Sequence, residues 1–200
     1  MRKNLLILLV AGLVLAGCGG GDSKGGLAGN GGQQNNGANV IGENETETAT
    51  EQQVYVLEFT DAVTTEGEKV SSDVFANSKL TMINVWATFC GPCINEMPDL
   101  GEIAGAYDAA DFQMIGIIAD TMEGDEDMLA EAKDIIEETG ANYPHLLLNE
   151  ELYMNLVGAS DSVPTTYFFN QDGELLGYAV GAKSKEAWEG IIDGLLEELK

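Results

Sequence analysis

Two cysteines separated by two residues carry the clearest chemistry in this 200-residue chain, in the run Cys90-Gly91-Pro92-Cys93. A Cys-X-X-Cys pair serves either as half of a zinc site or as a dithiol that exchanges with disulfides. A closed zinc site needs four Cys or His ligands. The chain has only four such residues, and they are scattered over Cys18, Cys90, Cys93 and His145. We therefore expect no metal site and favour thiol–disulfide exchange.

The residues around the pair favour Cys90 as the nucleophile. The segment 86–98 reads WATFCGPCINEMP, an apolar strand exit followed by a helix. Backbone N–H groups and the dipole at a helix N-terminus favour an anion, so the pKa of Cys90 should lie below the free value of about 8.5. Cys93, one turn further on, can then displace a mixed disulfide, and Pro92 suits an early helical position. The alternative is a purely structural disulfide, but so short a loop would add little stability.

Alternating strand-like and helix-like segments must position this pair. Along residues 54–200 short β-rich runs alternate with helix-length segments, which predicts an α/β fold with helices on the faces of a sheet. A turn at Gly67 predicts a hairpin between 54–61 and 69–71. Further strands are expected at 80–87, 112–119, 144–148, 165–170 and 174–180. Helices are expected from about Cys93 to Tyr107, over 126–139 with Gly140 as the stop, over 150–157, and after the cap residue Ser184.

The charge of the chain excludes several kinds of partner. There are 34 acidic and 9 basic residues, which give a formal net charge of -25. Phosphate backbones and anionic membrane surfaces repel such a chain, so nucleic-acid binding and attachment to membranes through basic residues are both disfavoured. A protein partner should present a neutral or basic docking face.

The N-terminus predicts export and a lipid anchor. Residues 1–17 place Arg2 and Lys3 before an apolar run, as in a signal peptide. The apolar run is 12 residues long, and its helix would rise about 18 Å, short of the roughly 30 Å hydrocarbon core. The sequence at 15–18, Leu-Ala-Gly-Cys, resembles the lipobox of bacterial lipoproteins, in which Cys18 becomes lipidated. An ordinary signal peptide is the alternative.

A change in composition separates the anchor from the folded part. Residues 18–53 contain ten glycines and no aromatic residue. Such a segment has too little apolar surface to form a core, so we expect a disordered tether. The folded domain is expected at 54–200.

The folded part resembles the TlpA/ResA-like group of thioredoxin-fold, membrane-anchored thiol-disulfide oxidoreductases. The matching features are Trp86, the CGPC motif, Pro98 and the run Val163-Pro164-Thr165. The resemblance implies a three-layer α/β/α thioredoxin-like fold with an N-terminal β-hairpin and an inserted helix-strand unit. It also implies a cis peptide bond before Pro164 and a Val163 backbone that hydrogen-bonds the substrate. Substrate contacts are expected at Trp86, Phe89, Gly91, Pro92, Val163 and Pro164.

The expected site departs from thioredoxin at Asn84. Thioredoxin has a buried Asp at this position, six residues before its first cysteine, and an amide cannot transfer that proton. Glu96, one turn after Cys93, is the replacement candidate, because ResA-like proteins place a Glu there. The alternative for Glu96 is a solvated helix-face residue. Phe89, where many relatives have Trp, should give Cys90 an apolar rim for docking.

The resemblance further implies an extracytoplasmic, lipid-anchored oxidoreductase that reduces disulfides of exported proteins. The Gly91-Pro92 pair is that of thioredoxin and favours a reducing potential, on the order of -270 mV, over the oxidising end near -120 mV. Electrons would come from a membrane donor of the CcdA type. We expect a monomer, with no cofactor beyond the redox-active disulfide Cys90–Cys93.

Two other classes of function stay open. A peroxiredoxin-like peroxidase would share the extended fold, but its signature includes a proline before the cysteine, and no proline precedes Pro92. A non-catalytic lipoprotein that binds haem or a metal could retain the fold. His145 is expected at the surface or a strand edge rather than in catalysis.

Overall fold

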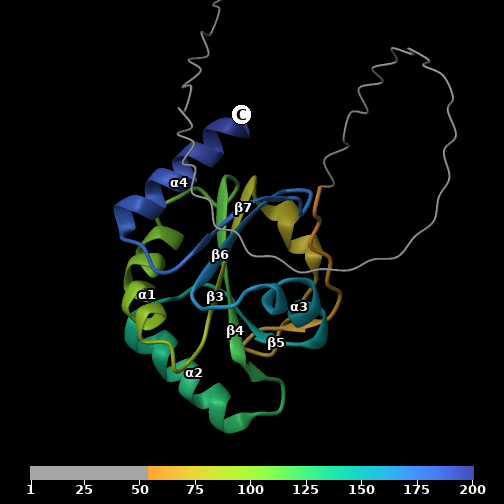
Figure 1. Ribbon diagram of the computed structural model, residues 1–200, viewed down its shortest axis with the longest axis vertical. Helices are drawn as coiled ribbons and strands as arrows, with labels where there is room; N and C mark the ends of the chain where they lie inside the picture. The colour runs from red at the N-terminus through yellow and green to blue at the C-terminus, as the bar shows by residue number, and fades with distance from the viewer. Residues whose placement is uncertain (1–53) are drawn as a thin grey trace, which may run out of the picture. The chain divides into compact units, whose positions relative to one another are not determined.

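The computed structural model of the chain describes residues 54–200 (Figure 1). The expected signal peptide 1–17, the lipidation site Cys18 and the tether 18–53 lie outside the described residues. Within 54–200, none of the helices combines the length and the apolar character that a membrane span requires.

A five-stranded mixed sheet forms the centre of the domain, with the strand order β5-β4-β3-β6-β7. β3 lies in the middle, parallel to β4 and antiparallel to β6. All seven residues of β3, LTMINVW, are buried, as expected for a central strand covered on both faces. The strands are β3 (Leu80–Trp86), β4 (Phe112–Met122), β5 (His145–Leu148), β6 (Thr165–Asn170) and β7 (Leu175–Val180).

Helices and short segments cover the two faces of the sheet (Figure 1). One face packs against α1 (Gly91–Ala104), α2 (Glu126–Thr139) and α4 (Lys185–Glu198). The other is covered by α3 (Glu150–Asn155), the 3-10 helices η1 (Ser72–Asn77) and η2 (Val157–Ala159), and the segment before β1. The expected three-layer α/β/α thioredoxin-like fold is confirmed, including the helix-strand unit α2–β5.

Local signals set the helix ends where the sequence predicts them. The Ser184 side chain accepts a hydrogen bond from the backbone N–H of Ala187 and caps α4. Gly140 ends α2 in the left-handed conformation, with φ of 68°. α1 ends at Ala104, one turn before the expected Tyr107.

The N-terminal hairpin is smaller than predicted and lies later in the chain. It joins β1 (Ala62–Val63) to β2 (Lys69–Val70) across the turn at Gly67. The predicted first strand, 54–61, is wrong as a hairpin partner, because residues 55–57 instead pair with residues 173–175 just before and at the start of β7, through an isolated bridge between Val56 and Glu174. It also buries Leu57 and Phe59 under the sheet, which the sequence pattern alone could not assign to a partner.

Candidate active site

The cysteine pair lies where the central strand passes into α1. Cys90 is the N-cap of α1, and its Sγ accepts a hydrogen bond from the backbone N–H of Cys93 at 3.3 Å. The two residues form a disulfide, with their Cα atoms 5.3 Å apart. Cys90 is 5% exposed and Cys93 is fully buried, so the outer sulfur of the pair belongs to Cys90. Pro92 occupies the first turn of the helix, as predicted.

The turn before Cys90 is held by a carboxylate that the sequence reasoning missed. Asp120, near the end of β4, accepts hydrogen bonds from the backbone N–H and the hydroxyl of Thr88, at 3.0 and 2.8 Å. The Cys90 N–H donates to the carbonyl of Ala87 at 3.0 Å. Phe89 points outward and is 78% exposed, which agrees with an apolar rim beside the sulfur. The sequence did hold a signal for Asp120: it is a polar residue near the end of β4, and parallel neighbouring strands bring their ends to the same edge of the sheet as the cysteines.

The Val163–Pro164 peptide bond is cis, as the resemblance implied. The register of β6 against β3 pairs Thr165 with Val85, so Pro164 lies next to the end of β3. The carbonyl of Pro164 accepts a hydrogen bond from the Gly181 N–H at 2.8 Å. The loop with Val163 therefore reaches the same edge of the sheet as the cysteine pair.

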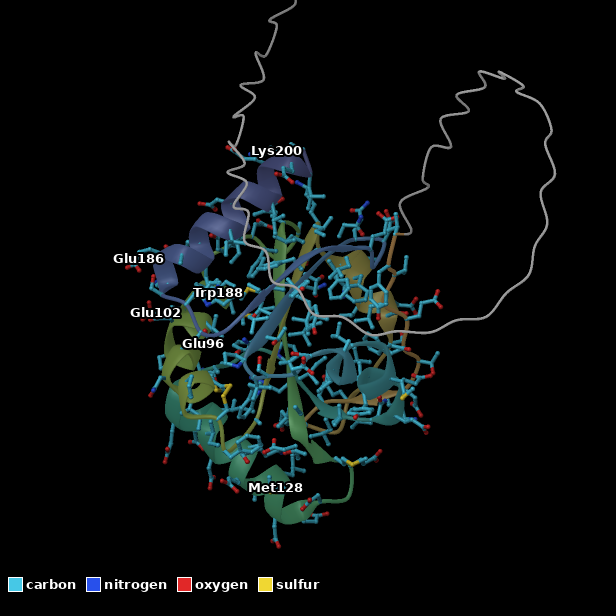
Figure 2. All side chains as sticks on the ribbon, viewed as in Figure 1. Glu96, Glu102, Met128, Glu186, Trp188 and Lys200 are labelled. Atoms are coloured by element: carbon cyan, nitrogen blue, oxygen red, sulfur yellow. A yellow bond between two sulfur atoms is a disulfide. The ribbon has the colours of Figure 1, made fainter. Side chains whose placement is uncertain are left out.

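Glu96 is buried, and the alternative of a solvated helix-face residue is wrong. It is 4% exposed and lies between α1 and α4, where Figure 2 shows it beside Trp188. Its Oε2 accepts hydrogen bonds from the Lys183 N–H at 3.1 Å and from the Trp188 indole at 3.3 Å. Its Oε1 accepts one from Asn84 at 3.2 Å. Burial raises the pKa of Glu96, and the three hydrogen bonds partly oppose that rise.

Asn84 is fully buried and bridges strand and helix. Its Nδ2 donates to Glu96 and, at 3.0 Å, to the hydroxyl of Thr166 on β6. An amide cannot take up a proton, so the ionisable group at this place is Glu96. Asn84 stands at the position of the thioredoxin Asp, and Glu96 is the expected replacement for that acid. The two side chains are in direct contact through a hydrogen bond.

His145 begins β5, an edge strand of the sheet, but it is not at the surface, which corrects that half of the prediction from the sequence. The side chain is 1% exposed, and its Nδ1 lies 3.1 Å from the indole nitrogen of Trp86. The prediction failed because a histidine after a proline at a strand start has no periodicity to show which way it points. Among residues 54–200 no group of three or more His, Cys, Asp or Glu side chains could hold a metal ion.

A thioredoxin-like fold with a redox-active cysteine pair at a helix N-terminus defines a thiol-disulfide oxidoreductase. Residues 50–177 match the AhpC/TSA family, and the chain belongs to that family.

Named relatives agree with this class. Thiol-disulfide oxidoreductase ResA of Bacillus thuringiensis (strain Al Hakam) is 24% identical over 127 residues, which cover 64% of this chain and 69% of that protein. Thioredoxin-like protein YneN of Bacillus subtilis (strain 168) is 29% identical over 130 residues, covering 65% and 72%. The crystal structure of a thiol:disulfide interchange protein from Chlorobium tepidum TLS superposes with a TM-score of 0.60 at 26% identity, over 70% of this chain and 94% of the other.

Proposed function

We propose that the protein reduces disulfides of exported proteins, with Cys90 as the nucleophile and Cys93 as the resolving cysteine. The observation that carries this assignment is the position of Cys90 as the N-cap of α1, where its Sγ accepts the Cys93 N–H. In the reduced protein the same N–H and the helix dipole favour the thiolate of Cys90. Cys90 is also the only one of the two with any solvent exposure.

The reaction needs no component besides the dithiol and the substrate. The Cys90 thiolate attacks one sulfur of the substrate disulfide, and the other substrate sulfur leaves as a thiolate. Cys93 then loses its proton and attacks Cys90 Sγ in the mixed disulfide, which releases the second substrate thiolate. Two electrons pass to the substrate, its two sulfurs take up two protons, and the protein is left with the Cys90–Cys93 disulfide. A membrane donor of the CcdA type would return it to the dithiol.

Glu96 is proposed as the group that takes up or supplies the proton of Cys93. Both residues lie on α1, three positions apart, and both are buried in one layer with α4. A carboxyl group whose pKa burial raises can exchange a proton closer to neutral pH than an exposed Glu can. This makes Glu96 the counterpart of the acid that thioredoxin places at the position of Asn84.

The substrate is proposed to lie along the loop that holds the cis peptide bond. Val163 lies next to the end of β3, and the exposed Phe89 ring flanks Cys90. The backbone of Val163 would hydrogen-bond an extended segment of the substrate, while the exposed Gly91 and Pro92 shape the floor. The expected substrate contact at Trp86 is wrong, because its side chain is fully buried beneath the surface. The acidic composition of the chain favours a neutral or basic segment.

The proposed location is outside the cytoplasm, with the lipid on Cys18 as the anchor. The lipobox-like sequence supports this. One structural neighbour, at 21% identity and a TM-score of 0.54, is described as a secreted Mycobacterium tuberculosis disulfide oxidoreductase. Replacing Cys18 with Ser should move the protein from the membrane fraction to the soluble fraction and leave the dithiol chemistry unchanged.

Insulin-disulfide reduction by the full chain tests the catalytic assignment. Cys90→Ser should lose activity. Cys93→Ser should stop at the mixed disulfide, and the same variant made in the cell, where insulin is absent, should trap the physiological substrate as its disulfide partner. Cys18→Ser is the matched control, since it removes a cysteine outside the dithiol and should keep full activity. Equal inactivity of wild type and Cys90→Ser, together with tight haem or metal binding, would favour a binding lipoprotein, and faster turnover of hydroperoxide than of disulfide would favour a peroxidase.

The direction of transfer follows from the midpoint potential of the pair. Equilibration with glutathione should give a value on the order of -270 mV, as expected for a reductant. A midpoint above about -150 mV would reverse the direction and make the protein an oxidant.

A further inference from the structure

A buried imidazole joins three strands of the sheet beside Trp86, which shares a hydrophobic cluster with the two cysteines. His145 begins β5, and its neighbour in register is Gly116 on β4. The imidazole nevertheless reaches β3, where its Nδ1 lies 3.1 Å from the indole nitrogen of Trp86. The side chain therefore crosses β4 at Gly116. None of the proposed redox steps uses this group.

Gly116 is what lets the ring cross. β4 is otherwise made of bulky residues over its buried part, FQMIGII. A Cβ atom added to Gly116 would lie 2.1 Å from His145 Nδ1 and 2.7 Å from Cε1, far inside contact distance. Glycine inside a strand weakens it, and it commonly marks a place where another group approaches the backbone closely. Here the approaching group is the imidazole.

The hydrogen bonds define a neutral imidazole with its proton on Nε2. An indole N–H can only donate, so Nδ1 of His145 accepts from Trp86. Nε2 lies 3.0 Å from the carbonyl of Ala141, which can only accept, and so carries the proton. The ring of Tyr143 stacks against the imidazole at 4.4 Å between centroids. Both nitrogens are satisfied, and burial lowers the pKa of His145 to about 4, which keeps it neutral near pH 7.

Trp86 connects this imidazole to the reacting sulfurs. It is the last residue of β3, it is fully buried, and it belongs to the same hydrophobic cluster as Cys90 and Cys93. The next residue, Ala87, accepts the hydrogen bond of the Cys90 N–H. The place of the indole thus sets the start of the turn that carries Cys90.

We propose that His145 is a positioning residue for the dithiol: by holding the Trp86 indole across Gly116, it fixes the turn from which Cys90 reacts. The proposal rests on the proposed role of Cys90. Closing a disulfide requires the two sulfurs in a narrow geometry, whereas a dithiol tolerates more freedom. An indole released from its acceptor therefore disfavours the disulfide more than the dithiol. The expected consequence is a more oxidising pair.

The test compares His145→Phe, which keeps a ring but removes both hydrogen bonds, with His145→Gln, which offers one acceptor and one donor. The redox equilibrium of each full-length protein is measured against glutathione, and the Trp86 indole N–H is followed by NMR. His145→Phe should shift the equilibrium constant at least five-fold toward the dithiol and speed hydrogen exchange at Trp86. His145→Gln should stay within two-fold of wild type.

Leu147→Ala is the matched control, since Leu147 is buried on the same strand and in the same cluster but makes no hydrogen bond to Trp86. It should lower stability and leave the redox equilibrium within two-fold. If His145→Phe does not fold, Gly116→Ala replaces it, because the added methyl must displace the ring, and it should shift the equilibrium in the same direction. An unchanged equilibrium in the folded variant, or an equal shift in Leu147→Ala, overturns the proposal. These readings do not depend on any substrate, so loss of insulin reduction in wild type would count against the proposed function alone.

Discussion

Two buried ionisable side chains lie on elements connected to the cysteine pair, Glu96 on the same helix and His145 against Trp86, and their surroundings differ. Glu96, on α1, accepts hydrogen bonds from three N–H donors but forms no ion pair. His145, on β5, is matched by one donor and one acceptor and lies in an apolar and aromatic setting. Burial shifts both groups toward neutrality, so the pKa of Glu96 rises and that of His145 falls.

The difference lies in what the surrounding donors favour. Three N–H groups directed at a carboxylate stabilise its charged form, so they oppose the rise in the Glu96 pKa that burial causes, and the side chain suits proton exchange. The indole N–H directed at Nδ1 of His145 tolerates only the neutral form, so that imidazole suits positioning. Burial can thus serve two purposes, and the number and type of hydrogen-bond partners decide between them.

The largest expected effect comes from removing the Glu96 carboxylate. Glu96→Leu removes the acceptor of the buried Trp188 indole, of the part-buried Lys183 N–H and of one of the two Asn84 amide protons, the other of which stays bonded to Thr166. At about 1–3 kcal/mol for each N–H left without an acceptor, we expect the free energy of unfolding to fall by about 4 kcal/mol. Urea denaturation measures the loss. Glu102→Leu is the control on the same helix, where an exposed carboxylate pairs with Lys185, and it should change stability little. Equal losses of stability in the two variants would show that removing the hydrogen-bonded Glu96 carboxylate costs no more than removing an exposed one, which contradicts the prediction.

The next effect is a loss of stability in acid that depends on His145. The unfolded histidine titrates near pH 6.5 and the folded one near pH 4, so between these values the unfolded state binds more protons and stability falls as the pH falls. The difference corresponds to about 3 kcal/mol, present above pH 6.5 and lost by about pH 4. Denaturation of wild type and His145→Phe at pH 7 and pH 4.5 should show a steeper loss in wild type.

The other titratable groups near His145 do not reverse this expected loss of stability in acid. Tyr143, stacked on the ring, stays neutral because burial raises its pKa. Glu66 and Glu68 line the same surface depression, and both are present in wild type and variant alike. If wild type and His145→Phe lost the same free energy of unfolding between pH 7 and pH 4.5, folding would not lower the pKa of His145. The contrast with Glu96 would then not hold.

The smallest effect is expected from Glu96→Gln. The amide keeps an acceptor and the shape of the side chain, so stability should change by about 1 kcal/mol. What should disappear is the pH dependence that Glu96 imposes on the cysteines in the range above the ordinary Glu pKa. Alkylation of Cys90 followed across pH 4 to 8 checks this, and superimposable profiles of variant and wild type would remove Glu96 from the proton-transfer role.

Prediction from sequence succeeded where the signal is local. The Cys-X-X-Cys spacing, the apolar β3 run and the caps at Ser184 and Gly140 each act within a few residues, and the structure has them as expected. The predicted pairing of segment 54–61 was wrong because strand pairing depends on the partner. Here the partner is near Glu174, more than a hundred residues away, and the local sequence pattern carries no sign of it. Asp120 was missed for the same reason. Its hydrogen-bond partner Thr88 follows β3, whereas Asp120 lies on β4, and the sequence does not show that the two meet.

The sequence by itself determined that a dithiol lies at a strand-to-helix junction in an α/β domain, because spacing and capping are properties of neighbouring residues, and the family resemblance added the thioredoxin-like fold. Only the tertiary structure decided that the candidate Glu96 is buried among hydrogen-bond donors and that His145 lies against Trp86. Glu96 meets Trp188 from 92 residues away, and Trp86 meets His145 from 59 residues away. Burial and hydrogen-bond partners arise from such contacts, and they set whether a carboxyl or an imidazole near the cysteines carries a charge.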